Sequence, residues 1–459
     1  TKYIWQFKVL PVMASYLGVR YMGYNADANP SAEENSRLKQ QPVYPSSPVV
    51  TDENWQKIVA YYVDNAPAQS PIDSSRLYRN QPLELFNSKL IPLSRTAGST
   101  VTAIAYDTTQ RELWVAEPDK LYRWNFAKGL THNYELPGTV VDVKFKNGGY
   151  LLTDIGTLLP SQVPKGSLFS FADDSLSTVR ANLHRPVCSL TADLNGDGID
   201  EIISCNFGFQ SGSLSLYTKL NSMDSTYRET VLLNQPGAVK CYVRDMNKDG
   251  RQDIVALFGQ QSEAVYVFYQ TGNLQFRAEK VLQFEPQYGT SDFILLDYNH
   301  DGIDDLAVVH GDNADYSYCL KAYHGLRVFL GHSDRTYTEA FFYPIYGATR
   351  LQADDFDQDG DIDFAVSSFF PELTTLSSES FVYLENKDSG RFTFTSHVLD
   401  TPVPIKSLTL EKADVDQDGD MDLVLGQFSY SPVAVPAKLQ RAWNMVDHKL
   451  VLLLNQHVR

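Results

Sequence analysis

Five segments of the sequence repeat one acidic pattern, D-x-[DN]-x-D-G-x-x-[DE]. Carboxylate or amide oxygens at positions 1, 3, 5 and 9 can converge on one hard cation together with the backbone carbonyl at position 7, and glycine at position 6 permits the sharp turn. The pattern therefore predicts five metal loops. Their expected ligands are Asp193, Asn195, Asp197, Ile199 and Glu201; Asp245, Asn247, Asp249, Arg251 and Asp253; Asp297, Asn299, Asp301, Ile303 and Asp305; Asp355, Asp357, Asp359, Asp361 and Asp363; and Asp414, Asp416, Asp418, Asp420 and Asp422.

Calcium suits these loops better than magnesium, which demands a stricter octahedron and keeps more water. The chain has 39 Lys and Arg against 56 Asp and Glu, a formal net charge of −17, and five divalent ions would bring that charge to −7. Asp, Asn and Gly also cluster in ordinary turns. Five copies in register favour the metal interpretation, with about five calcium ions as the expected cofactor.

The residues that follow each loop argue against a helix-flanked EF-hand. Position 12 of an EF-hand loop is a bidentate glutamate. Here that position is Ser204, Ala256, Val308, Val366 or Leu425, inside the apolar runs EIIS, DIVA, DLAV, DFAV and DLVL. Such runs are typical of buried strands. Each loop is therefore expected to join two strands, and a repeat of about 50 to 60 residues suits a four-stranded β-propeller blade.

Residues 97–455 accommodate seven units of about 51 residues each. Two units at 101–116 and 140–152 precede the acidic loops, and their turns carry too few carboxylates for an ion, so we expect them to be metal-free. The last unit lacks an outer strand, and residues 84–93 are predicted to supply it and to close the ring. The predicted fold is all-β: a seven-bladed β-propeller over residues 73–459 with a small α-helical N-terminal extension over residues 1–72.

The acidic loop leading into an apolar strand resembles the FG-GAP/VCBS repeat of integrin α-subunit propellers and of many exported bacterial proteins. The similarity covers residues from about 185 to 455. It implies that calcium lies in the loop between the two innermost strands of a blade, on the bottom face of the propeller. Loops of this type generally need abundant calcium, so we expect an extracytoplasmic location: periplasm, outer-membrane surface or secreted.

The N-terminal extension has a helical pattern. Thr51 is the expected N-cap of an amphipathic helix that contains Trp55, and an earlier helix within residues 2–17 is expected to bend near Pro11. Trp5 and Met13, together with the later helix, resemble the distal half of a small cytochrome c domain. The C-x-x-C-H haem motif is absent. Either this copy has lost its haem or an upstream segment is missing; the alternative is a plain helical cap on the propeller.

Composition excludes several classes of protein. The net negative charge would repel a nucleic-acid backbone, and no stretch approaches the roughly 18 apolar residues of a membrane helix. Four cysteines are present, without the C-x-x-C spacing of a zinc ribbon. Cys188 and Cys205 are placed to face each other across a hairpin, where they either form a disulfide or remain two buried thiols.

The loops on the face opposite the calcium loops are long and aromatic. Phe209, Tyr316, Phe370, Tyr430 and Trp443 are candidates to stack on a sugar or to anchor a protein. The phenylalanines directly after the second strands, such as Phe428, are instead expected to plug the central channel or to fill contacts between blades. The predicted function is a non-catalytic binding or scaffold module, as an adhesion protein or a subunit of a cell-envelope complex.

Two other functions remain open on the sequence alone. A carbohydrate-active enzyme of the polysaccharide-lyase kind would use His310 near Asp312, or His324 near Arg327, although the sequence has none of the common hydrolase motifs. An accessory subunit of an electron-transfer complex would require the missing haem segment. Partner identity and oligomeric state are not encoded in any pattern of the sequence.

Overall fold

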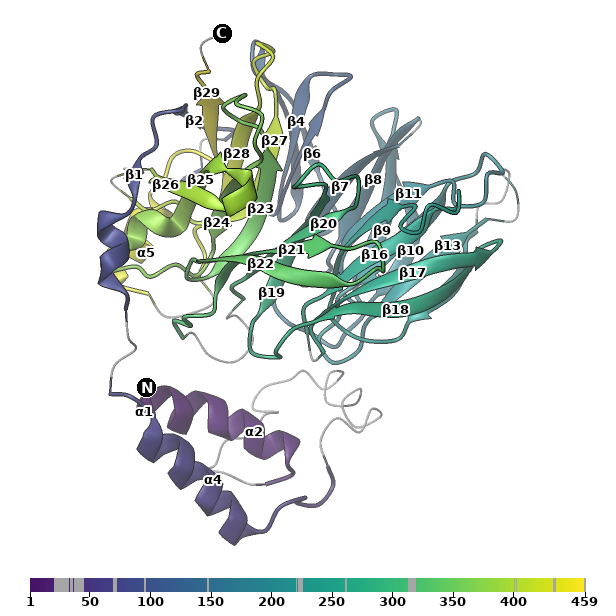
Figure 1. Ribbon diagram of the computed structural model, residues 1–459. Coiled ribbons are helices and arrows are strands. Elements are labelled where there is room, and N and C mark those ends of the chain that lie inside the picture. The colour runs from purple at the N-terminus through teal and green to yellow at the C-terminus, as the bar shows by residue number, and fades with distance from the viewer. Residues whose placement is uncertain are drawn as a thin grey trace.

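The computed structural model describes residues 1–459 except 20–32, 34, 35, 37–44, 69–71, 95, 147, 220, 222–225, 261, 313–318, 400, 402, 432–434, 458 and 459. Within these residues the chain forms seven sheets that follow one another around a common axis (Figure 1). The predicted seven-bladed propeller with a helical N-terminal extension is therefore confirmed.

Each blade has four principal strands, which follow one another from the propeller axis outward. In that order they are β3 (Ala103–Asp107), β4 (Glu112–Glu117), β5 (Lys120–Asn125) and β6 (Gly129–Glu135); β7 (Val140–Lys146), β8 (Gly149–Asp154), β9 (Gly166–Ala172) and β10 (Ser175–Leu183); β11 (Pro186–Ala192), β12 (Glu201–Asn206), β13 (Ser213–Thr218) and β14 (Arg228–Leu233); β15 (Ala238–Arg244), β16 (Asp253–Phe258), β17 (Ala264–Gly272) and β18 (Gln275–Gln283); β19 (Thr290–Leu296), β20 (Asp305–His310), β21 (Gly325–Gly331) and β22 (Tyr337–Pro344); β23 (Ala348–Asp354), β24 (Asp363–Ser368), β25 (Phe381–Asp388) and β26 (Thr393–Val398); and β27 (Ser407–Ala413), β28 (Asp422–Gln427), β29 (Leu450–Asn455) and β2 (Phe86–Ile91).

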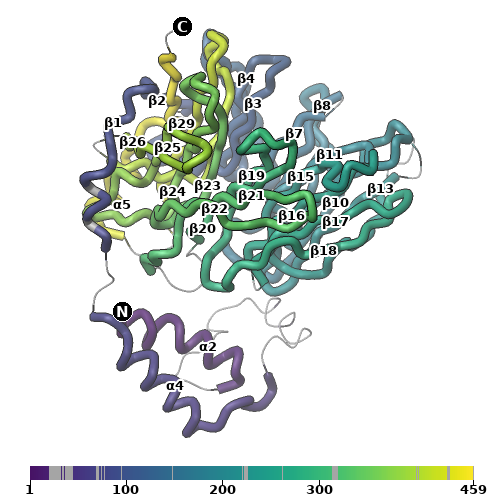
Figure 2. Tube along the Cα trace, viewed as in Figure 1, coloured from purple at the N-terminus to yellow at the C-terminus, as the bar shows by residue number. Residues whose placement is uncertain are grey.

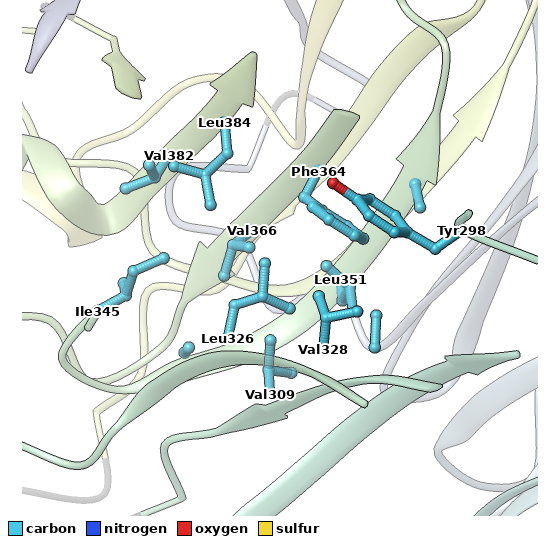
Figure 3. Packing of buried hydrophobic residues seen from close by; sticks show 13 residues of the cluster. Tyr298, Val309, Leu326, Val328, Ile345, Leu351, Phe364, Val366, Val382 and Leu384 are labelled. Carbon is cyan, nitrogen blue, oxygen red and sulfur yellow. The ribbon is translucent and has the colours of Figure 1, made fainter. Parts of the chain in front are cut away.

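The hydrophobic core lies between neighbouring blades. Every residue of the second strands β12, β16, β20, β24 and β28 is buried, as their apolar sequences predict. Figure 3 shows one such layer, in which Val309 and Val328 of the fifth blade pack towards Leu351, Val366 and Val382 of the sixth. Each sheet thus buries both faces, which fixes the relative position of the loops that the strands carry.

The last blade combines strands from both ends of the propeller. Strand β2 pairs antiparallel with β29, with Phe86 opposite Asn455 and Ile91 opposite Leu450. Strand β2 is therefore the outermost strand of the blade, the position that the sequence predicts for residues 84–93. The pairing covers an edge of β29 that would otherwise expose unpaired backbone groups. One further strand was not predicted: β1 (Gln81–Pro82) adds in parallel to β26 of the sixth blade.

A buried ion pair fastens the segment before β1 to the sixth blade. The 3₁₀ helix η2 (Ser74–Tyr78) carries Arg76, whose guanidinium donates to both oxygens of Glu379 in η3 (Ser377–Ser380). Both side chains are buried, Asn80 also donates to Glu379 at 3.1 Å, and the guanidinium lies over the Tyr346 ring. Burial raises the pKa of Glu379, and Arg76 opposes that rise.

We expect the substitution Arg76→Ala to lower the free energy of unfolding by about 3 kcal/mol, because it leaves the Glu379 carboxylate buried without its cation. The value lies at the low end for a broken buried pair because Asn80 keeps its hydrogen bond. Urea denaturation measures the change. Arg79→Ala, an exposed neighbour on the same segment, is the matched control and should change stability by less than about 0.5 kcal/mol. Equal effects of the two substitutions would contradict a role for the ion pair.

The N-terminal extension is a pair of helical segments set apart from the sheets in the traces of Figures 1 and 2. The first comprises α1 (Lys2–Ile4), the π-helical turn η1 (Trp5–Val9) and α2 (Leu10–Tyr16). The π turn ends at Val9, two residues before Pro11, which lacks a backbone N–H. The second is α4 (Asp52–Asn65), and Thr51 caps it by accepting from the Asn54 N–H at 3.3 Å.

These segments enclose a small core of their own. Trp55 and Leu10 are buried in it, and the Trp5 ring stacks on Tyr62 with a centroid distance of 4.2 Å. Met13 packs against the same cluster, so it contributes to the core as a hydrophobic residue. Among the described residues, no helix combines the length and the apolarity that crossing a membrane requires.

Candidate metal loops and axial cavity

The five acidic segments occupy equivalent positions in five consecutive blades. Each joins the innermost strand of its blade to the second strand, as the 193–200 segment joins β11 to β12. Because the blades succeed one another in the same strand order, all five segments lie on one face of the propeller. The structure therefore brings together within each loop the residues that the sequence pattern predicts as ligands.

The five loops also share one backbone conformation. The carboxylate at position 1 accepts a hydrogen bond from the N–H of the glycine at position 6 in every loop, at 2.8 to 3.2 Å. That glycine has a φ between +79° and +99° in all five copies. Residues with a side chain rarely adopt this conformation, so the invariance of glycine within the repeat has a steric reason. The five loops thus share one turn around the position-1 carboxylate.

The first three loops satisfy many of their polar groups internally. The position-3 side-chain amides of Asn195, Asn247 and Asn299 donate to the carboxylate at position 5 of the same loop, at 3.0 to 3.2 Å. In the second loop, Arg251 at position 7 also lies 3.6 Å from the Asp249 carboxylate. These contacts reduce the repulsion that a cation would otherwise have to relieve.

The fourth and fifth loops have aspartate at position 3 and fit a cation better. The carboxylates of Asp355, Asp357 and Asp359 converge with oxygens within 4.8 Å of one another. In the fifth loop those of Asp414, Asp416 and Asp422 do the same. One oxygen each of Asp355, Asp414, Asp416 and Asp420 is buried without a hydrogen-bond partner among the described residues. Buried, unpaired oxygens that face each other are the donor set that a hard cation takes.

Repulsion within these two loops has a direct electrostatic consequence. Burial, and after it the neighbouring carboxylates, raise the pKa of Asp357 and of Asp420 to about 6. Burial also raises the pKa of Asp363 and of Asp422 to about 7. Near neutral pH the ionised carboxylates of these loops are therefore energetically unfavourable. A divalent cation would remove this unfavourable electrostatic free energy.

The acid at position 9 has a second role that the pattern alone did not indicate. It is buried in every loop, and one oxygen accepts from the backbone N–H of position 2. In the last four loops its other oxygen accepts from a backbone N–H of the third strand, at 2.7 to 2.9 Å. Those donors come from Gln270, Gly331, Asn386 and Asn455. This acid therefore clamps the loop to the blade, and only the strand pairing reveals it.

Comparison with protein families supports the repeat on independent grounds. A family model described as an FG-GAP-like repeat matches residues 193–256, 245–308 and 355–425. The chain contains FG-GAP-like repeats. Together the three matches include all five acidic loops. They lie wholly within the FG-GAP propeller, and the cytochrome c resemblance of the N-terminal extension has no support from them.

Solved structures resemble this FG-GAP propeller only distantly. The N-terminal domain of Nup159 is 11% identical, with 82% of this chain and 96% of that chain covered, at a TM-score of 0.46. The WD40 domain of Neurospora crassa Pan2 is 10% identical, with 83% and 99% covered, at a TM-score of 0.48. Scores this low carry no argument about function. No curated protein matches the chain significantly.

The opposite face of the FG-GAP propeller contains a cavity of about 410 Å³ on the propeller axis. Its lining includes Phe207, Phe369 and Phe428, which follow second strands and so mark the face away from the metal loops. Charged side chains of the innermost strands form its wall: Asp142, Lys144, Lys240, Asp292, Arg350 and Glu411. Lys144 pairs with Asp142 at 3.0 Å, and Lys240 with Asp292 at 2.9 Å. A cavity of this size with a few converging polar groups suits a small ligand or an inserted side chain.

The aromatic residues proposed for this face lie in different environments. Tyr430 is 47% exposed and lines the cavity, whereas Phe370 and Trp443 are buried. Phe370 packs with Phe369 and Phe428 over the axis, and the Trp443 indole, on α5 (Ala437–Asn444), donates to the Pro404 carbonyl at 2.9 Å. The expectation that Trp443 contacts a ligand is therefore wrong, because its indole is turned to the Pro404 carbonyl, whereas Phe370 lines the cavity and stays a predicted contact. Tyr316 lies outside the described residues.

The two histidines considered for catalysis are in the interior. His310 is 0% exposed and His324 is 1% exposed, and burial lowers the pKa of each well below its usual value. His310 Nδ1 lies 2.8 Å from Thr290 Oγ1, which donates to Glu263. A polymer could not reach either imidazole in this conformation. Their burial agrees with a structural role.

The hairpin expected for Cys188 and Cys205 is present, and it includes a third cysteine. Cys188 and Cys205 lie directly opposite each other on β11 and β12. Cys241 on β15 of the next blade joins them, and all three are buried free thiols. Hydrogen bonds from the other two thiols hold the pKa of Cys188 well below its usual value. Of the two alternatives for this pair, the structure has the free thiols.

Proposed function

We propose that this protein is a calcium-stabilised, extracytoplasmic scaffold that binds a protein or a glycan through the face opposite its acidic loops. The proposal rests on one observation: the two faces of the propeller carry different features. One face presents five equivalent acidic loops, and the other presents an open axial cavity with polar and aromatic walls. FG-GAP-like repeats on a propeller are consistent with an interaction scaffold.

Calcium fits the donor atoms of the loops. Asp355, Asp357 and Asp359 would hold it in the fourth loop, and Asp414, Asp416 and Asp422 in the fifth, with the position-7 backbone carbonyls completing an all-oxygen set. When bound, the ion supplies positive charge that cancels carboxylate repulsion. The remaining three loops offer the same positions with fewer charges, and we expect them to bind more weakly.

An extracytoplasmic location follows from the affinity that such loops have. Exposed calcium modules outside the cell bind at about 10⁻⁴ to 10⁻³ M, a concentration that extracytoplasmic fluid provides. The metal loops of this chain are largely exposed at positions 3 to 6. We therefore assign the protein to the periplasm, the outer-membrane surface or the exterior, as an adhesion protein or a subunit of an envelope complex.

The partner is expected to engage the rim of the axial cavity. Tyr430 provides an exposed aromatic ring beside it, and Arg350 and Glu411 provide charged hydrogen-bonding groups inside it. Tyrosine and arginine are the residues that most often dominate binding energy at protein interfaces. We propose no catalytic step for His310 or His324, because both side chains are buried.

Binding is tested by comparing Tyr430→Ala with Tyr78→Ala. The native protein is first cross-linked in its cell envelope and screened on a glycan array in calcium, which identifies the partner. Tyr430→Ala should then weaken that interaction roughly tenfold or more, since it removes an aromatic contact at the cavity rim. Tyr78→Ala, which removes a ring that is 90% exposed before β1, should leave affinity unchanged. Equal affinities for both variants, or polysaccharide depolymerisation by the purified protein, would contradict the proposal.

A further inference from the structure

Three buried cysteines from two blades meet at one point of the FG-GAP propeller. Cys188 is on β11, Cys205 is directly opposite on β12, and Cys241 is on β15, the innermost strand of the following blade. Their sulfur atoms all lie within 4.8 Å of one another, and the three residues are 7%, 0% and 4% exposed. We call this group the thiol cluster. The fourth cysteine, Cys319, is half-buried and lies outside it.

The spacing of the sulfur atoms suits a metal ion. A thiolate sulfur lies about 2.3 Å from a bound metal, so three sulfurs in a plane around one ion are about 4 Å apart. The thiol cluster needs only a small contraction to reach that geometry. Apolar residues, among them Ile203, Leu214, Ala256 and Phe258, belong to the same core cluster as the three cysteines. An apolar shell excludes water and harder ligands, which favours a soft cation held by sulfur alone.

One member of the thiol cluster is reachable. Cys188 lines the axial cavity together with Lys144 and Asp142, so an ion can arrive from the cavity without unfolding a blade. Asp142 accepts from the Ser189 N–H at 3.0 Å and from Lys144 at 3.0 Å, which fixes both charged groups next to Cys188. The Lys144 ammonium partly compensates the negative charge of thiolates there. The site thus has ligands, a charged neighbour and an access route.

We propose that Cys188, Cys205 and Cys241 form a three-thiolate binding site for a soft monovalent cation of the Cu(I) class. Soft thiolate ligands select Cu(I), zinc or iron–sulfur clusters. Zinc takes four ligands in closed protein sites, and among the described residues no fourth His, Cys, Asp or Glu joins the thiol cluster. Three sulfurs therefore match Cu(I) best. Each thiol that ligates the ion loses its proton, which leaves through the axial cavity, and no electron is transferred.

The site is independent of the calcium proposal, because it involves other residues on another part of the blades. Its test is an anaerobic titration of the reduced full-length chain with Cu(I), in competition with a chromogenic Cu(I) chelator. We expect one ion per chain, with near-ultraviolet thiolate-to-copper absorption. Cys188→Ser and Cys241→Ser should each weaken binding by at least about 100-fold, whereas the matched control Cys319→Ser should bind as the wild type does.

A second measurement covers the case in which a buried substitution unfolds the blade. Wild-type protein with and without Cu(I) is treated with an alkylating reagent in denaturant, and the modified cysteines are identified by mass spectrometry. Cu(I) should protect Cys188, Cys205 and Cys241 but not Cys319. Equal labelling of all four cysteines, tighter binding of zinc than of Cu(I), or a Cu(I) affinity that Cys319→Ser lowers as much as Cys188→Ser would each overturn the proposal.

Discussion

Removal of calcium at pH 7.5 should lower the melting temperature of this protein by about 5 °C. A ligand at 100 times its dissociation constant stabilises the folded state by about 2.7 kcal/mol per site. The fourth and fifth loops, which contain the unpaired buried oxygens, would together provide about 5 kcal/mol. For a domain of this size the entropy of unfolding is large, and each kcal/mol shifts the melting temperature by roughly 1 °C. Thermal unfolding followed by circular dichroism, in calcium and in EDTA, measures the difference.

The melting temperature should depend on pH in opposite directions with and without calcium. In the metal-free protein the pKa values of Asp363 and Asp422 are raised to about 7, and those of Asp357 and Asp420 to about 6. An unfolded aspartate has a pKa of about 3.9, so between these values the folded state binds more protons. The stability that this provides is complete below about pH 4 and is lost as pH rises through about 7. In EDTA the protein should therefore melt higher at pH 5.5 than at pH 7.5.

Calcium should reverse that order, because it binds the ionised carboxylates and competes with protons. At pH 7.5 the calcium-induced rise in melting temperature should exceed the rise at pH 5.5. Magnesium at the same concentration is the control cation and should stabilise less, since it requires a tighter octahedron. Identical melting curves in calcium and in EDTA at both pH values would show that the loops are ordinary turns, and the inferred location would lose its basis.

The sequence predicts the parts of this structure that depend on local pattern. Each acidic loop contains its own ligands within nine residues, and the buried second strands follow as continuous apolar runs. Strand β2 was also predictable, because an incomplete last blade requires a partner for β29. None of these inferences requires information about how neighbouring blades pack against each other.

What the sequence could not predict depends on packing between distant segments. Cys241 joins Cys188 and Cys205 only because β15 follows β11 around the axis. Trp443 is buried because α5 folds back onto the 404 region, so loop length wrongly suggested exposure. The clamp made by the position-9 acids was hidden for the same reason, since its second donor is on the third strand. Arg76 and Glu379 are likewise 303 residues apart in the chain.

The position-9 clamp predicts that Asp422→Ala is one of the most damaging single substitutions in the protein. Its carboxylate accepts from the Val415 N–H at 2.9 Å and from the Asn455 N–H at 2.9 Å. Alanine leaves both buried donors unsatisfied, at about 1 to 3 kcal/mol each. Loss of the ion in the fifth loop adds about 2.7 kcal/mol in calcium. The free energy of unfolding should therefore fall by about 7 kcal/mol in calcium and by about 4 kcal/mol in EDTA.

Asp418→Ala in the same loop separates the two contributions. Asp418 is at position 5, is exposed, and accepts from the Asp420 N–H at 3.2 Å, within the loop itself. Its removal should weaken calcium binding and lower stability by up to about 2.7 kcal/mol in calcium, with almost no change in EDTA. Urea unfolding of both variants under both conditions gives the four values. If EDTA abolished the effect of Asp422→Ala as well, the carboxylate would act only as a ligand. A loss of stability that persists in EDTA for Asp422→Ala alone would show that this carboxylate has two roles. It would both hold the ion and anchor the loop to β29.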